Sequence, residues 1–170
     1  MHGEDVDPRC QRVTFADLNR RITLAAMAER SAIPGRHLAI VTCMDARIDP
    51  HHALGLELGD AHVLRNAGAV VGDDVLRSLV LSQRLLGTTS VAVMAHTDCG
   101  LRKVHDDELS HQLEVETGQA PPFAFGAFFD LDEHVRQQVQ RVRACPWLPH
   151  VDAVRGYVLD VADATVREVV

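Results

Sequence analysis

The 170-residue sequence lacks long hydrophobic runs and has few cysteines. Asp, Arg, Gly or His interrupts every apolar run before it reaches the roughly 18 residues that a membrane span requires. We therefore expect a soluble protein without a membrane partner. Four cysteines are too few for a disulfide scaffold in a chain of this length, so reduced thiols or metal ligands are favoured. The four cysteines are Cys10, Cys43, Cys99 and Cys145.

The sequence also lacks an excess of positive charge and an export signal. Its formal net charge is -7, whereas nucleic-acid binding normally needs clustered cations that displace counterions. We therefore expect no nucleic-acid partner. The first residues, MHGEDVDPRCQRV, are polar and acidic instead of basic and then apolar, so a cytoplasmic location is expected.

No internal repeat and no linker rich in Gly and Ser divides the chain, and a hydrophobic content of 46% can fill one core. We expect residues 1–12 to form a flexible N-terminal arm and residues 13–170 to form a single domain. Thr14 and Asp17 have the spacing of a capping box, which predicts a first helix that ends near Ser31.

Strand and helix patterns alternate along the rest of the chain. Short apolar runs bounded by turn residues predict strands at 38–42, 61–66, 90–96 and within 154–161. A helix is predicted within 72–87, with Asp73 or Asp74 as its N-cap and Gly87 as its stop. A polar helical stretch follows Gly100, and a later helix has one apolar stripe, made of Leu131, Val135, Val139 and Val142.

This alternation predicts an α/β fold, a single domain with a mainly parallel central sheet of four to five strands flanked by helices. In such sheets, ligands bind outside the carboxyl ends of the strands. Cys43 ends the first expected strand, Arg65 and Asn66 end the second, and His96 ends the third. The most reactive residues are thus expected at one edge of the sheet.

The sequence HTDCG places His96 and Cys99 three residues apart, so that both side chains can reach a single cation. Cys43 can supply a third ligand from the neighbouring strand. Two thiolates and one imidazole match the preferences of Zn²⁺, and three protein ligands leave a fourth position for water. Water on zinc has a pKa near 7, so such a site can hold hydroxide near neutral pH.

Two charged residues follow the first of these cysteines. Asp45 can accept a hydrogen bond from the hydroxide, but it is also short enough to bind the metal directly and close the fourth position. Arg47 can hold Asp45 back with a bidentate ion pair. The spacing is equally typical of a surface Asp and Arg in a turn, and both interpretations stay open.

CMDAR and HTDCG, with RNAG between them, resemble the motifs of the β-class carbonic anhydrases, and most closely those of the short bacterial branch. The resemblance is strong over residues 38–100 and weaker to the C-terminus. It implies Zn²⁺ held by Cys43, His96 and Cys99, a dyad of Asp45 and Arg47, and the reversible hydration of carbon dioxide to bicarbonate.

The resemblance also implies a homodimer or a dimer of dimers, in which the N-terminal helix packs on the partner. We expect the backbone near Ala67 and Gly68 and the amide of Gly100 to help position the small-molecule substrate. Glu57 matches the position of a glutamine that contacts substrate in plant-type members. We therefore do not count this substrate contact among those expected here. Four of the five Phe lie at 123–129, a cluster more typical of a core than of a pocket.

Three other functions remain open. Relatives in the same branch hydrolyse carbonyl sulfide or carbon disulfide with the same metal set. Alternatively, Cys43 is a thiolate nucleophile with Arg47 as its oxyanion partner, although MDA between them is short for an anion-binding loop. The last alternative is a non-catalytic, metal-stabilised binding module with a closed four-ligand site.

Overall fold

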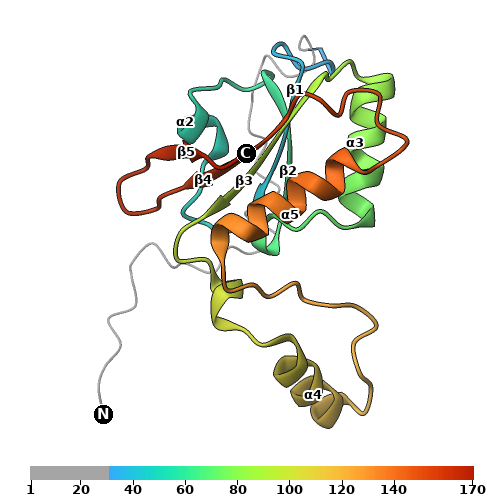
Figure 1. Ribbon diagram of the computed structural model, residues 1–170, viewed down its shortest axis with the longest axis vertical. Coiled ribbons are helices and arrows are strands. Elements are labelled where there is room, and N and C mark those ends of the chain that lie inside the picture. Colours follow the sequence, from blue (N-terminus) through green and yellow to red (C-terminus); the bar gives the residue numbers. More distant parts are fainter. Residues whose placement is uncertain (1–30) are drawn as a thin grey trace, which may run out of the picture. The chain divides into compact units, whose positions relative to one another are not determined.

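The computed structural model describes residues 31–170, which form one compact unit (Figure 1). The expected N-terminal arm and first helix lie outside the described residues. Within residues 31–170, no helix combines the length and the apolar character needed to cross a membrane.

A five-stranded sheet forms the centre of this unit, with the order β2-β1-β3-β4-β5 (Figure 1). The first four strands pair in parallel and β5 is antiparallel to β4. This arrangement confirms the predicted α/β class and the mainly parallel sheet. The strands are β1 (Leu38–Cys43), β2 (Ala61–Asn66), β3 (Ser90–His96), β4 (Val154–Leu159) and β5 (Val166–Glu168).

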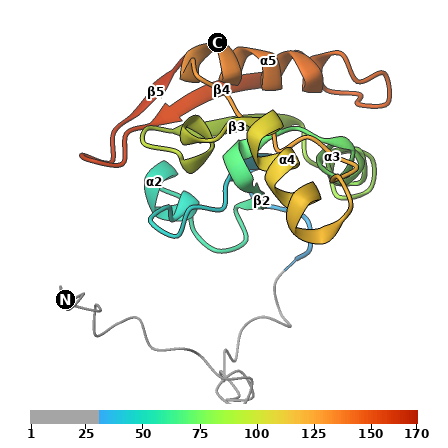
Figure 2. The ribbon, with the colours of Figure 1, turned by 90° about the horizontal axis from the view of Figure 1, so that it is seen from below.

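The two central strands are buried because helices cover both faces of the sheet. Five of the six residues of β1 and six of the seven residues of β3 are buried. Helix α2 (Pro50–Leu54) lies on one side, and α3 (Asp73–Leu85) and α5 (Leu131–Arg143) lie on the other (Figures 1 and 2). Burial on both faces explains why these strands are continuous apolar runs without polar alternation.

Helix α5 packs closely on β4. Its predicted apolar stripe of Leu131, Val135, Val139 and Val142 is buried throughout, which confirms that prediction. A Cβ atom at Gly156 of β4 would lie only 2.5 Å from Cγ1 of Val135. Glycine at this position therefore allows the helix to approach the sheet.

The start of α3 differs from the prediction. Gly72 is the N-cap and no side chain caps the helix, whereas Asp73 and Asp74 lie in its first turn. Their carboxylates still favour the helix, because negative charge near the N-terminus opposes the positive end of the helix dipole. Gly87 follows the helix with φ 71°, a left-handed conformation that suits the predicted stop.

The segment 104–130 leaves the sheet and returns to it at α5. It contains α4 (Asp106–Thr117), which has no buried residue and lies away from the sheet in Figure 1. The predicted aromatic core is wrong for much of this segment. Phe128 is buried, but Phe123 and Phe129 are 64% and 66% exposed, because the segment projects from the core instead of covering it.

Candidate metal centre and active site

The strand order places a topological switch point between β1 and β3. The chain runs from β1 outward to β2, then returns to β3 and continues outward to β4 on the other side. Crevices form at such points outside the carboxyl ends of the strands, because the two crossovers lie on opposite faces. Cys43 is the last residue of β1 and His96 is the last residue of β3, so both lie at this point.

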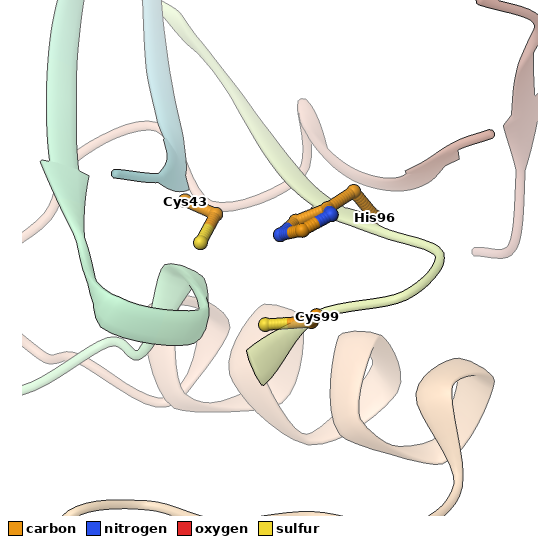
Figure 3. Close-up of side chains that lie close together, drawn as sticks. All are labelled: Cys43, His96 and Cys99. Carbon is orange, nitrogen blue, oxygen red and sulfur yellow. The ribbon is translucent and has the colours of Figure 1, made fainter. Parts of the chain in front are cut away.

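Cys43, His96 and Cys99 converge there, as the sequence predicted (Figure 3). One potential ligand atom from each residue lies within 4.8 Å of the other two. All three residues are buried, with exposed fractions of 4%, 1% and 3%. The fold and this cluster define a parallel α/β protein with a candidate metal site at its switch point.

The hydrogen bonds of His96 fit a metal ligand. Its Nδ1 lies 2.8 Å from the carbonyl oxygen of Thr97, which can only accept, so Nδ1 carries the proton. The lone pair is then on Nε2, which is buried and makes no hydrogen bond in the described part of the chain. A buried nitrogen without a partner is costly, and a cation at the centre of the cluster would satisfy it.

The two sulfurs differ in acidity. Contact with the Cys99 thiol holds the pKa of Cys43 well below its usual value, and contacts with His96 and with the backbone N–H groups of Asp45 and Gly68 add to this effect against the opposing burial. The same contact raises the pKa of Cys99. A thiolate is thus already favoured at Cys43, and thiolate is the form that binds zinc.

Asp45 and Arg47 form the predicted bidentate pair. Oδ1 of Asp45 accepts from Nε of Arg47 at 3.0 Å, and Oδ2 accepts from Nη2 at 2.7 Å. These bonds lower the pKa of Asp45. Oδ2 lies 3.9 Å from Nε2 of His96, yet Asp45 is outside the cluster of mutually close ligand atoms. In this arrangement the ion pair holds Asp45 beside the candidate metal position.

Asp98 is a second partner of Arg47 that sequence reasoning missed. Its Oδ2 accepts from Nη1 of Arg47 at 2.9 Å, its carbonyl oxygen accepts from Nη2 at 3.1 Å, and its Oδ1 accepts from Lys103 at 2.8 Å. Asp98 lies inside HTDCG, which is the one signal that could have found it. Its φ of 52° turns the loop toward Arg47, and spacing does not reveal that conformation.

Arg65 also has a role that the sequence did not reveal beyond its place at a strand end. Its Nε donates to the carbonyl oxygen of Cys43 at 3.0 Å, and its Nη2 donates to that of Asp45 at 2.8 Å. Arg65 therefore ties the end of β2 to the backbone that carries the sulfur and the carboxylate.

The three predicted substrate-positioning residues have different places. Ala67 and Gly68 form the short 3-10 helix η1 (Ala67–Ala69), directly after β2, and the Gly68 N–H points at the sulfur of Cys43. Gly100 begins the short 3-10 helix η2 (Gly100–Lys103) beside Cys99, and a Cβ there would meet open space. Glu57 lies in the turn before β2, at the amino ends of the strands and thus away from the cluster.

Comparison with known proteins agrees with this geometry. A family model described as carbonic anhydrase matches residues 38–121. The β-carbonic anhydrase 1 of Mycobacterium tuberculosis (strain ATCC 25618 / H37Rv) is 46% identical over 136 residues, which cover 80% of this chain and 83% of that protein. A carbon disulfide hydrolase of Acidianus sp. (strain A1-3) is 30% identical over 174 residues, with 88% and 85% covered.

A solved structure gives the same result. The carbonic anhydrase of Streptococcus mutans superposes with a TM-score of 0.81 at 37% identity, covering 94% of this chain and 100% of that one. The chain belongs to the β-carbonic anhydrase family. Zinc is the cofactor of this family, and the cluster of two thiols and an imidazole offers the ligand types that zinc prefers.

Proposed function

We propose that this protein catalyses the reversible hydration of carbon dioxide to bicarbonate and a proton, with Zn²⁺ held by Sγ of Cys43, Nε2 of His96 and Sγ of Cys99. The observation that carries the proposal is the buried Nε2 of His96, which lacks a hydrogen bond and faces two sulfurs at the switch point. When bound there, zinc supplies a Lewis acid that lowers the pKa of water.

Asp45 is proposed to orient the attacking water by accepting its proton in a hydrogen bond. Each carboxylate oxygen has about two acceptor positions. Oδ2 uses one for Arg47 and lies 3.9 Å from Nε2 of His96, so its second position is available beside the ligands. Arg47 keeps this carboxylate ionised and would hold it back from a metal bound by Cys43, His96 and Cys99.

The backbone near the two sulfurs is proposed to help position the substrate. Gly68 lies two residues after the end of β2 and Gly100 directly follows Cys99, and neither has a side chain that would narrow the approach. Ala67 precedes Gly68 in the same turn. Gly100 is next to Cys99 in the chain, and the backbone N–H of Gly68 contacts Cys43 in space, which supports the assignment.

Stopped-flow hydration of carbon dioxide by zinc-quantified protein, from neutral to alkaline pH, tests the proposal. We expect activity that rises with pH and then levels off, since the attacking water must lose a proton. Protein with one zinc per chain and no hydration above the buffer rate across this range would contradict the proposed activity.

Carbon disulfide or carbonyl sulfide is the second candidate substrate. The 30% identity to a carbon disulfide hydrolase over most of both chains supports it, because attack of water on a linear electrophile can use the same metal ligands. Release of hydrogen sulfide from either compound, measured on the same zinc-quantified samples, separates the two candidates. A higher kcat/KM for the sulfur compound would make it the preferred substrate.

We also propose a homodimer or a dimer of dimers and a cytoplasmic location. The resemblance to the family supports the first and the charge pattern of the sequence supports the second. Light scattering of the zinc-loaded protein gives its mass, and a monomer at assay concentration would contradict the proposed assembly.

A further inference from the structure

Two polar side chains interrupt the apolar face of α5. His134 and Gln138 are only 5% and 7% exposed, on a helix whose other buried side chains are Leu and Val. Burying a polar group is unfavourable unless hydrogen bonds compensate for the lost water. The contacts of these two residues therefore indicate what they do.

His134 connects α5 to the turn after β2. Its Nε2 donates to the carbonyl oxygen of Gly68 at 2.8 Å, and its Nδ1 lies 3.4 Å from the amide nitrogen of Gln138. Burial lowers the pKa of His134, so the imidazole is neutral, with one donor and one acceptor nitrogen. The ring also stacks on Phe128, with centroids 3.8 Å apart and planes inclined by 10°.

Gln138 fixes the same turn at a second point. Its Oε1 accepts from the backbone N–H of Val71 at 2.9 Å, while its amide group faces Nδ1 of His134. This contact selects the tautomer of His134 in which Nε2 carries the proton. The two side chains thus act together on the backbone between Gly68 and Val71.

Gly68 is held from several sides. Its carbonyl oxygen accepts from Nε2 of His134, and its N–H contacts Cys43 and lowers the pKa of that thiol. Its φ is 73°, and a Cβ would lie 2.6 Å from Cδ1 of Leu101. Its N–H and its carbonyl belong to the two peptide groups that meet at its Cα, so contacts at both groups leave the residue little rotational freedom.

We propose that His134 is a positioning residue for the metal site, which fixes Gly68 so that its N–H donates to the Cys43 thiolate. This inference rests on the proposed role of Cys43 as a zinc ligand. A hydrogen bond to a ligating sulfur reduces the charge that the sulfur gives to the metal and orients it. His134 therefore acts on the zinc centre without contacting it.

Three variants of the zinc-loaded full chain test the inference. His134→Phe keeps a stacking ring and removes the donor. His134→Gln places an amide nitrogen near the position of Nε2 and so restores the hydrogen-bond donor. Val139→Ala removes buried volume from the same helix face, which lies against β4 at Gly156, and so controls for lost stability. The readouts are the rate of zinc release to excess chelator and the ¹¹³Cd NMR shift of the cadmium-substituted proteins.

We expect His134→Phe to release zinc about tenfold faster, at the low end of the range for residues that support metal ligands. Its ¹¹³Cd resonance should move, because that shift reports the electron density on the sulfurs. His134→Gln should restore both readouts to near the wild-type values. Val139→Ala should unfold at a lower temperature with an unchanged ¹¹³Cd shift.

An unchanged ¹¹³Cd shift in His134→Phe, or the same change in Val139→Ala, would overturn the inference. If His134→Phe does not fold, Gln138→Leu replaces it as the test variant. A displaced ¹¹³Cd resonance in Gln138→Leu supports the inference, and an unchanged one overturns it. Neither readout depends on carbon dioxide, so failure of the proposed hydration in the wild-type protein is a separate result.

Discussion

The carboxyl edge of the sheet and the segment 104–130 differ in how they hold their residues. At the edge, Cys43, His96 and Cys99 are at most 4% exposed, and the first two are the last residues of the paired central strands β1 and β3. In the segment, α4 buries no residue, and Phe123 and Phe129 are mostly exposed. Figure 1 shows this difference as a continuous sheet beside an extended excursion.

The difference indicates where precise chemistry can be built. Neighbouring parallel strands fix the ends of β1 and β3 through regularly spaced hydrogen bonds, so side chains there have defined positions. Segment 104–130 depends instead on isolated contacts, such as those of Asp106 with the backbone at Gly126 and Ala127. Changes at the edge should therefore affect the metal and the reaction, and changes in the exposed part of the segment, away from the buried Phe128, should affect only local order.

The largest effect is expected for Cys43→Ser. Loss of one thiolate removes about a quarter of the roughly 10–16 kcal/mol typical of a structural zinc site, which corresponds to zinc binding on the order of a hundredfold weaker. Metal analysis after dialysis should find well below one zinc per chain. The matched control is Cys145→Ser, another buried free thiol outside the cluster. Full zinc occupancy in Cys43→Ser would remove this residue from the ligand set.

A smaller effect is expected for Arg47→Ala. Zinc should remain bound, but Asp45 loses its bidentate partner and can move onto the metal, so hydration should fall by roughly a hundredfold. Parallel zinc analysis and stopped-flow assays separate the two effects. Arg36→Ala is a fitting control, because Arg36 pairs with Asp60 near the amino ends of the strands. Undiminished hydration in Arg47→Ala would exclude the proposed role of the ion pair.

Asp98→Asn is expected to have a weaker effect still. Arg47 would keep its bonds to Asp45 and lose the charge of its second carboxylate partner, which is 53% exposed. Exposed ion pairs contribute about 0.2–1 kcal/mol, so kcat should fall by no more than about fivefold with zinc unchanged. Lys103→Ala removes only the outer partner of Asp98 and serves as the control. A loss as large as that of Arg47→Ala would mean that Asp98 has a more direct role.

Much of the carboxyl edge could be predicted because its signals are local. Apolar runs at β1 and β3 predict buried strands, and parallel strands bring Cys43 and His96 to one edge whatever lies between them. Asp45 and Arg47 are two residues apart, so their pairing also needs little tertiary information. Strand β5 was missed because its three residues include the exposed Arg167 and Glu168, which give no apolar signal.

Contacts set by tertiary structure could not be predicted in the same way. Asp98 reaches Arg47 through a left-handed loop conformation, and His134 lies 66 positions from its partner Gly68. Asp74 is of a residue type that often caps helices, yet the N-cap of α3 is Gly72. The Phe residues of segment 104–130 looked like a core, because sequence does not reveal that the chain leaves the sheet at this point.

The smallest effect is expected for Asp106→Asn, at the start of α4. Its two carboxylate oxygens accept from the backbone N–H groups of Ala127 at 2.8 Å and Gly126 at 3.0 Å. The variant should leave zinc and hydration unchanged. Limited proteolysis within segment 104–130 should be about two- to fivefold faster, as expected for an exposed electrostatic contact.

The pH dependence of this contact has a defined sign. The N–H of Ala127, followed by that of Gly126, lowers the pKa of Asp106 in the folded protein. The contact therefore stabilises the segment above the ordinary Asp pKa of about 3.9 and is lost as pH falls through the lower folded value. Cleavage by an acid-active protease should then become equal in the wild type and Asp106→Asn. Asp107→Asn, one residue on in the same helix turn, is the control, and equally fast cleavage of that variant at neutral pH would refute the assigned role of Asp106.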